Sequence, residues 1–170
     1  MNITIQIDTT QLTLTCGDLV LPCRVGMDGF VAMKDGREGD RKTPLGDYAL
    51  RFGLYRADRL PPPRSALTFR PLREDDGWCD DPDSAAYNRF IRLPALVSHE
   101  KMWREDGAYD IILVISHNDS PPVPHLGSAV FIHVAQPDDR KTMGCVALAP
   151  DEMAQLLPHL RMGMTVRITS

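Results

Sequence analysis

The fold of this chain is decided by residues 129–148, which read AVFIHVAQPDDRKTMGCVAL. An apolar run rich in β-branched and aromatic side chains begins at Ala129 and ends at His133, which predicts a buried strand. A polar loop follows, and a second apolar stretch starts directly after Cys145. An imidazole and a thiol are therefore expected at the ends of two buried elements.

The segments on either side also predict β structure. Residues 111–115 form an uninterrupted apolar run, which is typical of a central strand buried on both faces. Apolar residues alternate along 3–7 and 12–16, and after a turn another apolar stretch covers residues 19–21. Residues 164–168 alternate in the same way and predict a closing strand.

Few helices are expected. Residues 150–152 are predicted to start a helix, because proline is tolerated in the first turn and acidic side chains interact favourably with the positive end of the helix dipole. Pro158 should end this helix. Residues 98–106 are predicted to form a second short helix, and the glycine-rich, charged residues 34–47 a surface connection. The patterns together predict one mostly β domain over residues 1–170, sandwich-like or barrel-like.

The composition excludes some classes of protein. With 170 residues the chain is long enough for one proper core, and a net charge of −4 argues against a nucleic-acid binder. No run approaches the roughly 18 apolar residues of a membrane span. The first eight residues lack the basic start and apolar block of a secretion signal. If the chain is complete, we expect a cytoplasmic protein; otherwise the periplasm is expected.

The four cysteines show no CxxC pair and no metal-ligand spacing, so no metal site and no cofactor is predicted. A zinc site made of His117, His125, His133 and Cys145 would match no standard spacing. Cys16 and Cys23 would form a bridge if they lay on neighbouring strands in an oxidising compartment, but free thiols in a reducing cytosol fit the sequence better.

Cys145 and His133 are the candidate catalytic pair. A thiol is a poor nucleophile until it loses its proton, and an imidazole within hydrogen-bond reach takes that proton and stabilises the thiolate. Gly144 has no side chain, so the N–H groups of Met143, Gly144 and Cys145 are expected to turn toward an oxyanion. By spacing alone, a buried small cysteine and a satisfied core histidine are the commoner interpretations.

The sequence around this pair resembles the L,D-transpeptidase catalytic domain, the YkuD family. That signature has a histidine on a strand, a variable loop, then Ser or Thr, any residue, Gly, Cys and an aliphatic residue. The resemblance extends from about residue 24 to the end of the chain. Its other motifs are residues 34–46, which end in TPLG, and Gly77-Trp78-Cys79-Asp80-Asp81-Pro82, Tyr87-Asn88, Tyr109-Asp110, His117-Asn118 and Gly127-Ser128-Ala129.

The resemblance implies a mostly β YkuD fold and acyl transfer on peptidoglycan stem peptides. Cys145 would be the nucleophile and His133 the base, oriented by a backbone carbonyl such as that of Val134. The thiolate would attack the L-centre carbonyl of meso-diaminopimelate and expel D-alanine. Three departures limit the transfer of roles: Met143 and Ala147 replace the histidine and arginine that many members carry, and the loop between His133 and Cys145 is shorter than in cross-linking enzymes.

Several further side chains are candidates for binding substrate. Each also has a structural interpretation, as a strand cap for the histidine and as core packing for the aromatics. Arg92 and Arg104 are able to pair with a substrate carboxylate by bidentate hydrogen bonds, but the solvated surface is the expected place for each. The candidate substrate-binding residues are Thr142, His117, Asn118, Trp78 and Tyr87.

The sequence therefore predicts a cytoplasmic L,D-carboxypeptidase that removes terminal D-alanine from muropeptide tetrapeptides in cell-wall recycling. One alternative is an L,D-transpeptidase that cross-links peptidoglycan. The other is a catalytically silent module that only binds peptides. A stem peptide or muropeptide is the expected partner, and the sequence predicts no oligomeric state.

Overall fold

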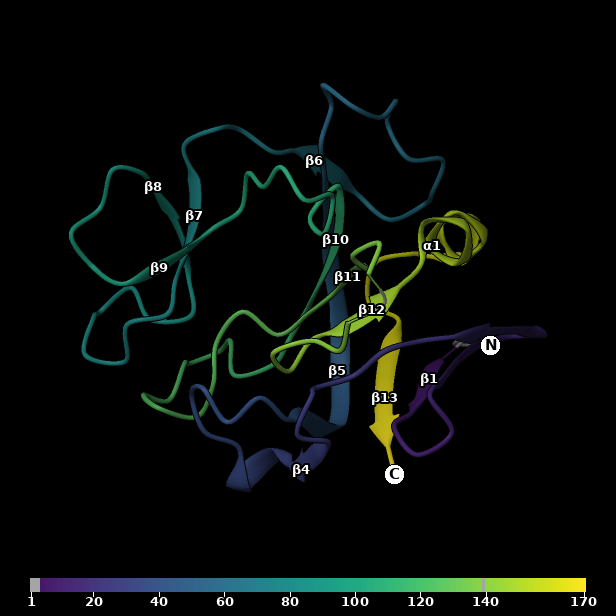
Figure 1. Cartoon of the computed structure of the whole chain (residues 1–170), viewed down its shortest axis with the longest axis horizontal. Helices are drawn as coiled ribbons and strands as arrows, with labels where there is room; N and C mark the ends of the chain where they lie inside the picture. Colours follow the sequence, from purple (N-terminus) through teal and green to yellow (C-terminus); the bar gives the residue numbers. More distant parts are fainter. Residues whose placement is uncertain (1–3, 139) are drawn as a thin grey trace.

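The computed structural model of the chain describes residues 4–138 and 140–170. Strands dominate it, and the helical segments are short (Figure 1). The helical segments are η1 (Met33–Asp35), α1 (Pro150–Leu156) and η2 (Leu157–His159). The strands are β1 (Ile5–Asp8), β2 (Thr13–Cys16), β3 (Leu19–Pro22), β4 (Phe30–Ala32), β5 (Thr43–Tyr55), β6 (Phe69–Pro71), β7 (Asp76–Cys79), β8 (Phe90–Arg92), β9 (His99–Lys101), β10 (Ile111–Ile115), β11 (Phe131–Val134), β12 (Val146–Leu148) and β13 (Thr165–Thr169).

The main sheet is nearly closed on itself. Its strand order is β12-β11-β10-β5-β13-β1-β2-β3, with β4 and β6 paired to the two ends of the long strand β5. Just after β3, Arg24 exchanges two backbone hydrogen bonds of 2.8 Å with Ala147 of β12, which joins the two edges of the sheet. This confirms the predicted mostly β, barrel-like fold with few short helices.

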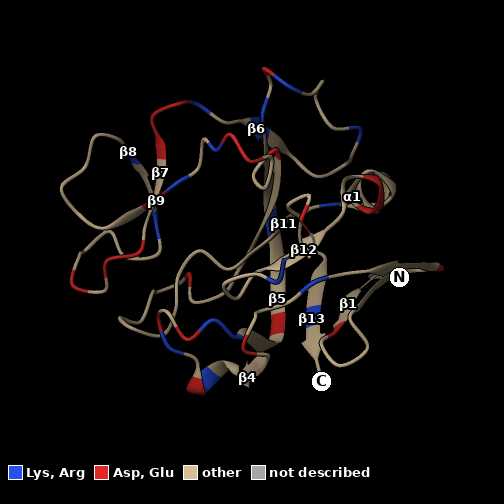
Figure 2. Ribbon diagram, viewed as in Figure 1, with Lys and Arg blue, Asp and Glu red and all other residues tan. Residues whose placement is uncertain are grey.

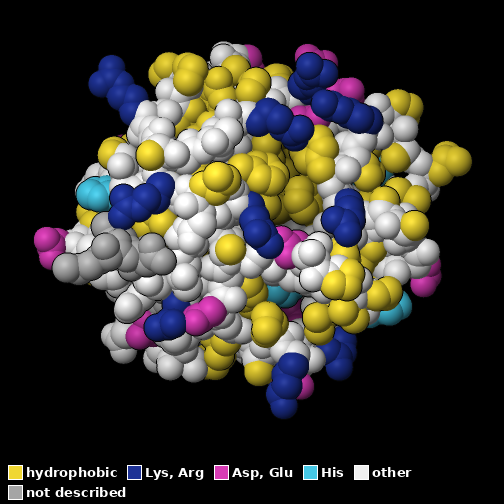
Figure 3. Space-filling model, turned by 180° about the vertical axis from the view of Figure 1, so that it is seen from behind, with side chains coloured by type: hydrophobic (Ala, Val, Ile, Leu, Met, Phe, Trp, Pro, Cys, Tyr) yellow, Lys and Arg dark blue, Asp and Glu magenta, His cyan; other side chains and the backbone are white. Residues whose placement is uncertain are grey.

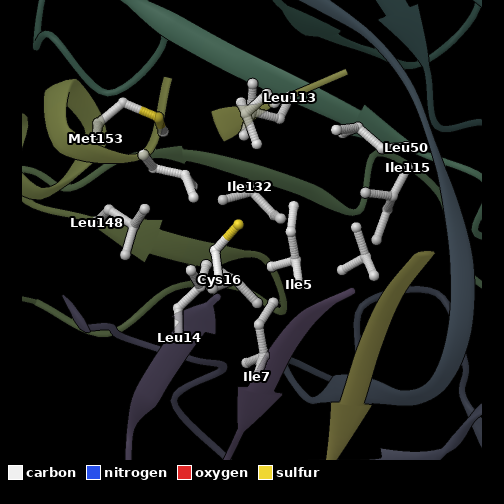
Figure 4. Close-up of a cluster of buried hydrophobic side chains, with 14 of the residues drawn as sticks. Ile5, Ile7, Leu14, Cys16, Leu50, Leu113, Ile115, Ile132, Leu148 and Met153 are labelled. Atoms are coloured by element: carbon white, nitrogen blue, oxygen red, sulfur yellow. The ribbon is translucent and has the colours of Figure 1, made fainter. Parts of the chain in front are cut away.

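The inside of this sheet holds the main apolar core. Ile5 and Ile7 of β1, Leu113 of β10 and Ile132 of β11 are fully buried, and Figure 4 shows these side chains pointing toward one another. Met153 of α1 joins the same cluster, because the helix packs against β3, β11 and β12. The alternation seen in the sequence thus marks the residues that face the barrel interior.

A second, smaller core lies on the outer face of β10 and β11. Ile112, Val114 and Phe131 pack there against Trp78 and other side chains from the segment that carries β7, β8 and β9. These three strands form a separate small sheet beside the barrel (Figure 1). Strand β10 is apolar throughout because it is buried on both faces, as predicted. Residues on the outer face of β11 consequently lie between the barrel and this small sheet.

Two sequence-based predictions about local structure are wrong. Residues 98–106 form no helix: His99–Lys101 is strand β9, which pairs with β7, and this pairing overrides the weak helical preference. The surface connection predicted for residues 34–47 ends early, because Thr43 already belongs to β5 and pairs with Phe30 of β4.

The possible bridge between Cys16 and Cys23 is also excluded. Cys16 lies opposite Leu19 near the turn of the β2–β3 hairpin, whereas Cys23 lies at its open end and donates its N–H to Leu12. Disulfides need Cα atoms within about 7 Å, and these residues sit at opposite ends of paired four-residue strands. All four cysteines are free thiols.

The surface carries charges of both signs. Acidic and basic positions are interspersed along the ribbon in Figure 2. Figure 3 shows the face opposite to that of Figure 1, where apolar side chains gather around a hollow with Lys and Arg side chains near it. Among the described residues, no helix combines the length and the apolar content that crossing a membrane requires.

Candidate active site

Strand register places Cys145 and His133 on one face of the sheet. In the parallel pair β11–β12, Ile132 lies opposite Val146 and His133 opposite Ala147. Cys145 immediately precedes β12 and is therefore level with Phe131, two residues before His133. Side chains two residues apart on a strand point to the same face. Both Cys145 and His133 line a cavity of about 620 Å³ between the barrel and the small sheet.

The surroundings of His133 fix its tautomer. Its Nδ1 lies 2.7 Å from the carbonyl oxygen of Val134, as expected, and a carbonyl only accepts. Nδ1 therefore carries the proton, which leaves the Nε2 lone pair as the basic site. Burial lowers the pKa of His133, against the opposing effects of the Val134 and Ala108 carbonyls. The imidazole is thus neutral at pH 7 and able to accept a proton.

Cys145 rests as a thiol in this structure. Its Sγ donates to the carbonyl of Ala129 at 3.2 Å and accepts from the N–H of Phe131 at 3.4 Å. Burial, and then the charge of Glu100, raise the pKa of Cys145 to about 12. Within the described residues no hydrogen bond joins this thiol to His133. Burial thus favours the neutral thiol at this position, and the predicted transfer of its proton to His133 stays a prediction.

The loop before Cys145 is braced by two threonine hydroxyls. Thr142 Oγ1 donates to the Cys145 carbonyl at 2.5 Å and accepts the Gly144 N–H at 3.1 Å. Thr43 Oγ1 donates to the Gly144 carbonyl at 2.9 Å. Thr142, a predicted substrate-binding residue, lines the cavity, but both hydrogen bonds of its hydroxyl are made within the loop. Its role in this structure is to hold the backbone of the nucleophile.

Gly144 matters for a different reason from the one predicted. Its φ is +131°, and a Cβ at this position would lie 2.9 Å from the carbonyl oxygen of Lys42, so only glycine fits. Its N–H is already bonded to Thr142 Oγ1, so in this structure Gly144 is not free to make the predicted oxyanion contact. In the part of the chain that is described, the N–H groups of Met143 and Cys145 have no acceptor, and these two remain available for an oxyanion.

Of the other predicted substrate-binding residues, His117 borders the cavity and three do not. Trp78 is buried, because its ring packs on Phe131 with centroids 5.0 Å apart. Tyr87 is buried, and its hydroxyl donates a hydrogen bond to Glu38. The side-chain amide of Asn118 donates its hydrogen bonds to backbone carbonyls of its own loop. Trp78, Tyr87 and Asn118 therefore do not line this cavity, since packing and local hydrogen bonds hold their side chains behind its wall.

Asn88 connects the small sheet to the nucleophile, a role that the sequence analysis missed. Its Oδ1 accepts from Trp78 Nε1 at 2.9 Å and from the Ala129 N–H at 3.1 Å. Its Nδ2 donates to the carbonyls of His117 and Asn118 at 3.0 and 2.7 Å. The Ala129 carbonyl accepts a hydrogen bond from the thiol of Cys145, and the Ala129 N–H is bonded to Asn88. Asn88 therefore holds the segment against which the sulfur rests.

We expect Asn88→Ala to destabilise the protein by about 3 kcal/mol, because several buried donors and acceptors would lose their partner together. Urea unfolding measures the change, and Asn88→Asp is the matched variant because it keeps the acceptor for Trp78. A loss below about 1 kcal/mol in Asn88→Ala would mean that water replaces the amide without cost.

A polar wall beside the catalytic pair was also missed. Tyr109 is buried with its ring centroid 5.3 Å from that of His133, and its hydroxyl donates to Glu100 Oε1 at 2.5 Å. Arg104, predicted on the solvated surface, lines the cavity with its guanidinium 4.9 Å from the Tyr109 ring centroid and 3.7 Å from Glu100 Oε1. These residues come from a segment with weak hydrophobic periodicity, so no local pattern indicated that their side chains line the site.

The buried imidazole of His117 is expected to make the stability of the protein depend on pH. Burial lowers its pKa from 6.5 to about 4, so the unfolded chain binds the proton more readily than the folded one. The contribution of His117 to the free energy of unfolding is therefore complete above pH 6.5. As the pH falls toward 4, we expect the free energy of unfolding to decrease by about 3 kcal/mol. Urea unfolding against pH should show this loss in the wild type and a smaller one in His117→Leu. His159→Asn, at an exposed position, is the control, and equal pH dependence in all three proteins would contradict the prediction.

No metal centre is present among the described side chains: no three His, Cys, Asp or Glu residues within residues 4–138 and 140–170 come together as ligands. The chemistry that this geometry can perform is proton transfer from a thiol to an imidazole, followed by attack on a carbonyl bound in the cavity.

Comparisons with known proteins agree with the observed fold. The model of the L,D-transpeptidase catalytic domain family, YkuD, matches residues 2–168. Among solved structures, the chain is similar to Bd1075 from Bdellovibrio bacteriovorus, with 15% identity, a TM-score of 0.52, and coverage of 99% of this chain and 48% of that one. The Ldtfm–avibactam carbamoyl enzyme gives 11% identity, a TM-score of 0.52, and coverage of 100% and 49%.

A variant of the helical cell shape determining protein Pgp2 from Campylobacter jejuni gives 15% identity, a TM-score of 0.50, and coverage of 99% and 47%. The chain thus spans about half the length of these solved structures. No curated protein matches it.

Proposed function

Because the chain belongs to the L,D-transpeptidase catalytic domain family, we propose that it is a cysteine acyl transferase acting on peptidoglycan stem peptides. More specifically, we propose L,D-carboxypeptidase activity, the removal of terminal D-alanine from tetrapeptides. The observation that carries the proposal is the placement of Cys145 and His133 on one face of the sheet, at the same cavity.

The first half-reaction uses these two side chains. As Sγ of Cys145 attacks the carbonyl carbon of the donor residue, its proton passes to Nε2 of His133. We assign the stabilisation of the oxyanion to the N–H groups of Met143 and Cys145, because within the described residues neither has an acceptor. When the C–N bond breaks, His133 returns the proton to the amine of D-alanine, and a thioester on Cys145 remains.

In the second half-reaction His133 takes a proton from water, and the hydroxide formed attacks the thioester carbon. The C–S bond breaks, the thiolate regains a proton, and the shortened peptide leaves. We propose hydrolysis, and not transfer to an amine, because the family resemblance implies a loop between His133 and Cys145 that is shorter than in cross-linking enzymes and so alters the acceptor side. The four free cysteines agree with a reducing compartment, and we propose the cytoplasm as the site of action.

Incubation with a disaccharide tetrapeptide tests the function, with product masses followed over time. Loss of one D-alanine is the expected result. A dimeric product would instead indicate a cross-linking transpeptidase, and tight binding without any product would indicate a silent peptide-binding module. The Cys145→Ala protein, incubated in parallel, is the control for contaminating activity.

A further inference from the structure

A second cavity, of about 750 Å³, lies across strand β9 from the catalytic cavity. His99 and Lys101 line this second cavity, whereas Glu100 between them lines the catalytic one. Successive side chains of a strand point to opposite faces, so β9 forms the wall between the two cavities. His99 borders both of them, which means that the cavities meet at this residue.

Trp103 contributes an aromatic surface to the second cavity. The guanidinium of Arg56 lies over its ring, 3.6 Å from the centroid. Arg56 is only 2% exposed, and it donates two hydrogen bonds of 2.8 Å to Asp58 and one to the carbonyl of Arg104. The ring of Trp103 is half-buried, and residues 93–95 line the cavity beside it. One face of the ring is thus fixed by a buried cation, and its uncovered part is a rigid apolar surface.

The polar side chains of the second cavity leave little net charge. Asp75 and Glu105 are each paired with an arginine, at 3.0 and 2.6 Å. Glu74 and Lys101 have opposite charges, are exposed, and form no ion pair within the described residues. The Nδ1–H of His99 donates to a backbone carbonyl at 2.7 Å, which leaves its Nε2 as an acceptor. The cavity therefore offers both donors and acceptors without an excess of either charge.

An aromatic surface bordered by such groups fits a saccharide. A pyranose ring presents C–H groups on its face, which pack on the electron-rich face of an aromatic ring. Its hydroxyl groups lie around its edge, and each of them both donates and accepts hydrogen bonds. A strongly charged ligand would need an excess of the opposite charge in the cavity. A wholly apolar ligand would leave the polar groups without partners.

We propose that the second cavity binds a sugar of the substrate, with a pyranose ring stacked on Trp103. The inference rests on the proposed function, since the catalytic cavity would hold the stem peptide. In a muropeptide the sugar is joined to the amino end of that peptide, away from the terminal D-alanine. Because the two cavities meet at His99, a peptide that leaves the catalytic cavity there carries its sugar into the second one. The preferred substrate class is therefore a stem peptide that still bears its sugar.

Two substrates that differ only in the sugar test this site, the disaccharide tetrapeptide and the free tetrapeptide. We expect kcat/KM to be about tenfold higher for the disaccharide form, because a stacked aromatic contact and several hydrogen bonds are added. The difference should lie in KM and not in kcat, since the sugar does not touch the reacting atoms.

Trp103→Leu removes the stacking surface, so the ratio between the two substrates should fall toward one while kcat for the free tetrapeptide is unchanged. Trp103→Tyr keeps an aromatic face and should retain most of the preference. Phe30→Leu changes an exposed aromatic residue outside both cavities, and as the matched control it should keep the wild-type ratio. Thermal melts verify that each variant is folded. A wild-type ratio near one, or an unchanged ratio in Trp103→Leu, overturns the sugar site while leaving the proposed function intact.

Binding to the wild-type protein tests the site without a variant and without turnover. The ligand is the peptide-free disaccharide of N-acetylglucosamine and N-acetylmuramic acid, and NMR follows the indole N–H signals of the two tryptophans. The signal of Trp103 should shift, and that of Trp78, which is buried and bonded to Asn88, should not. If the enzyme hydrolyses neither tetrapeptide, the proposed function fails and this titration decides the inference separately. An unchanged Trp103 signal then overturns it.

Discussion

Cys145→Ala is expected to lower kcat for D-alanine release by at least about 10⁴-fold, because removing a nucleophile removes the covalent route entirely. The fold should survive, since Cys145 is only partly buried and the loop around it is held by Thr142 and Thr43 through backbone atoms of the loop. Mass spectrometry of the products and a thermal melt measure the two quantities on the same sample.

Cys16→Ala is the matched control for Cys145→Ala. Cys16 is a fully buried thiol of the barrel core, so its removal leaves a cavity and should lower stability while turnover remains near the wild-type level. Comparison of the two variants therefore distinguishes a catalytic cysteine from a cysteine that only packs in the core. Turnover by Cys145→Ala close to that of the wild type, or its failure to fold, would exclude Cys145 as the nucleophile.

His133→Gln is expected to lower kcat by about 10²–10⁴-fold, the usual contribution of a general base. Glutamine retains an N–H for the Val134 carbonyl but offers no group that takes the thiol proton at neutral pH. In the wild type, kcat/KM should rise with pH as the imidazole loses its proton. Because burial lowers the pKa of His133, this rise should lie below pH 6.5.

The pH profile distinguishes a base from a merely structural residue. The rise below pH 6.5 should be absent in His133→Gln and present in His159→Gln, whose side chain is exposed at the end of η2. If His133→Gln keeps the same rise, the proton acceptor is another group. If it loses activity only because it unfolds, a thermal melt shows this directly.

The strands could be predicted because their signal is local. Residues 111–115 are apolar at every position, and the structure buries both faces of β10. The helix that starts at Pro150 could also be predicted, because its start depends on a proline and two acidic side chains that are adjacent in the sequence. The helix predicted for residues 98–106 failed, because pairing of β9 with β7, about twenty residues away, outweighed its local preference.

For the site, the sequence alone indicated Cys145 and His133 through a strand, a loop and a short motif that are contiguous in the chain. Only the tertiary structure decided how these groups behave. The thiol of Cys145 is protonated because of burial and the charge of Glu100, which lies 45 residues earlier in the chain.

The same holds for the roles of the neighbouring side chains. Thr142 supports a loop, Asn88 holds the backbone segment against which the sulfur rests, and Glu38, Asp80 and Glu100 line one cavity although they come from separate segments. Periodicity and turn chemistry depend on residues within a few positions, so a sequence determines them alone. Burial, proton affinity and the direction of a hydrogen bond depend on atoms that folding brings together, and only the folded structure decided them.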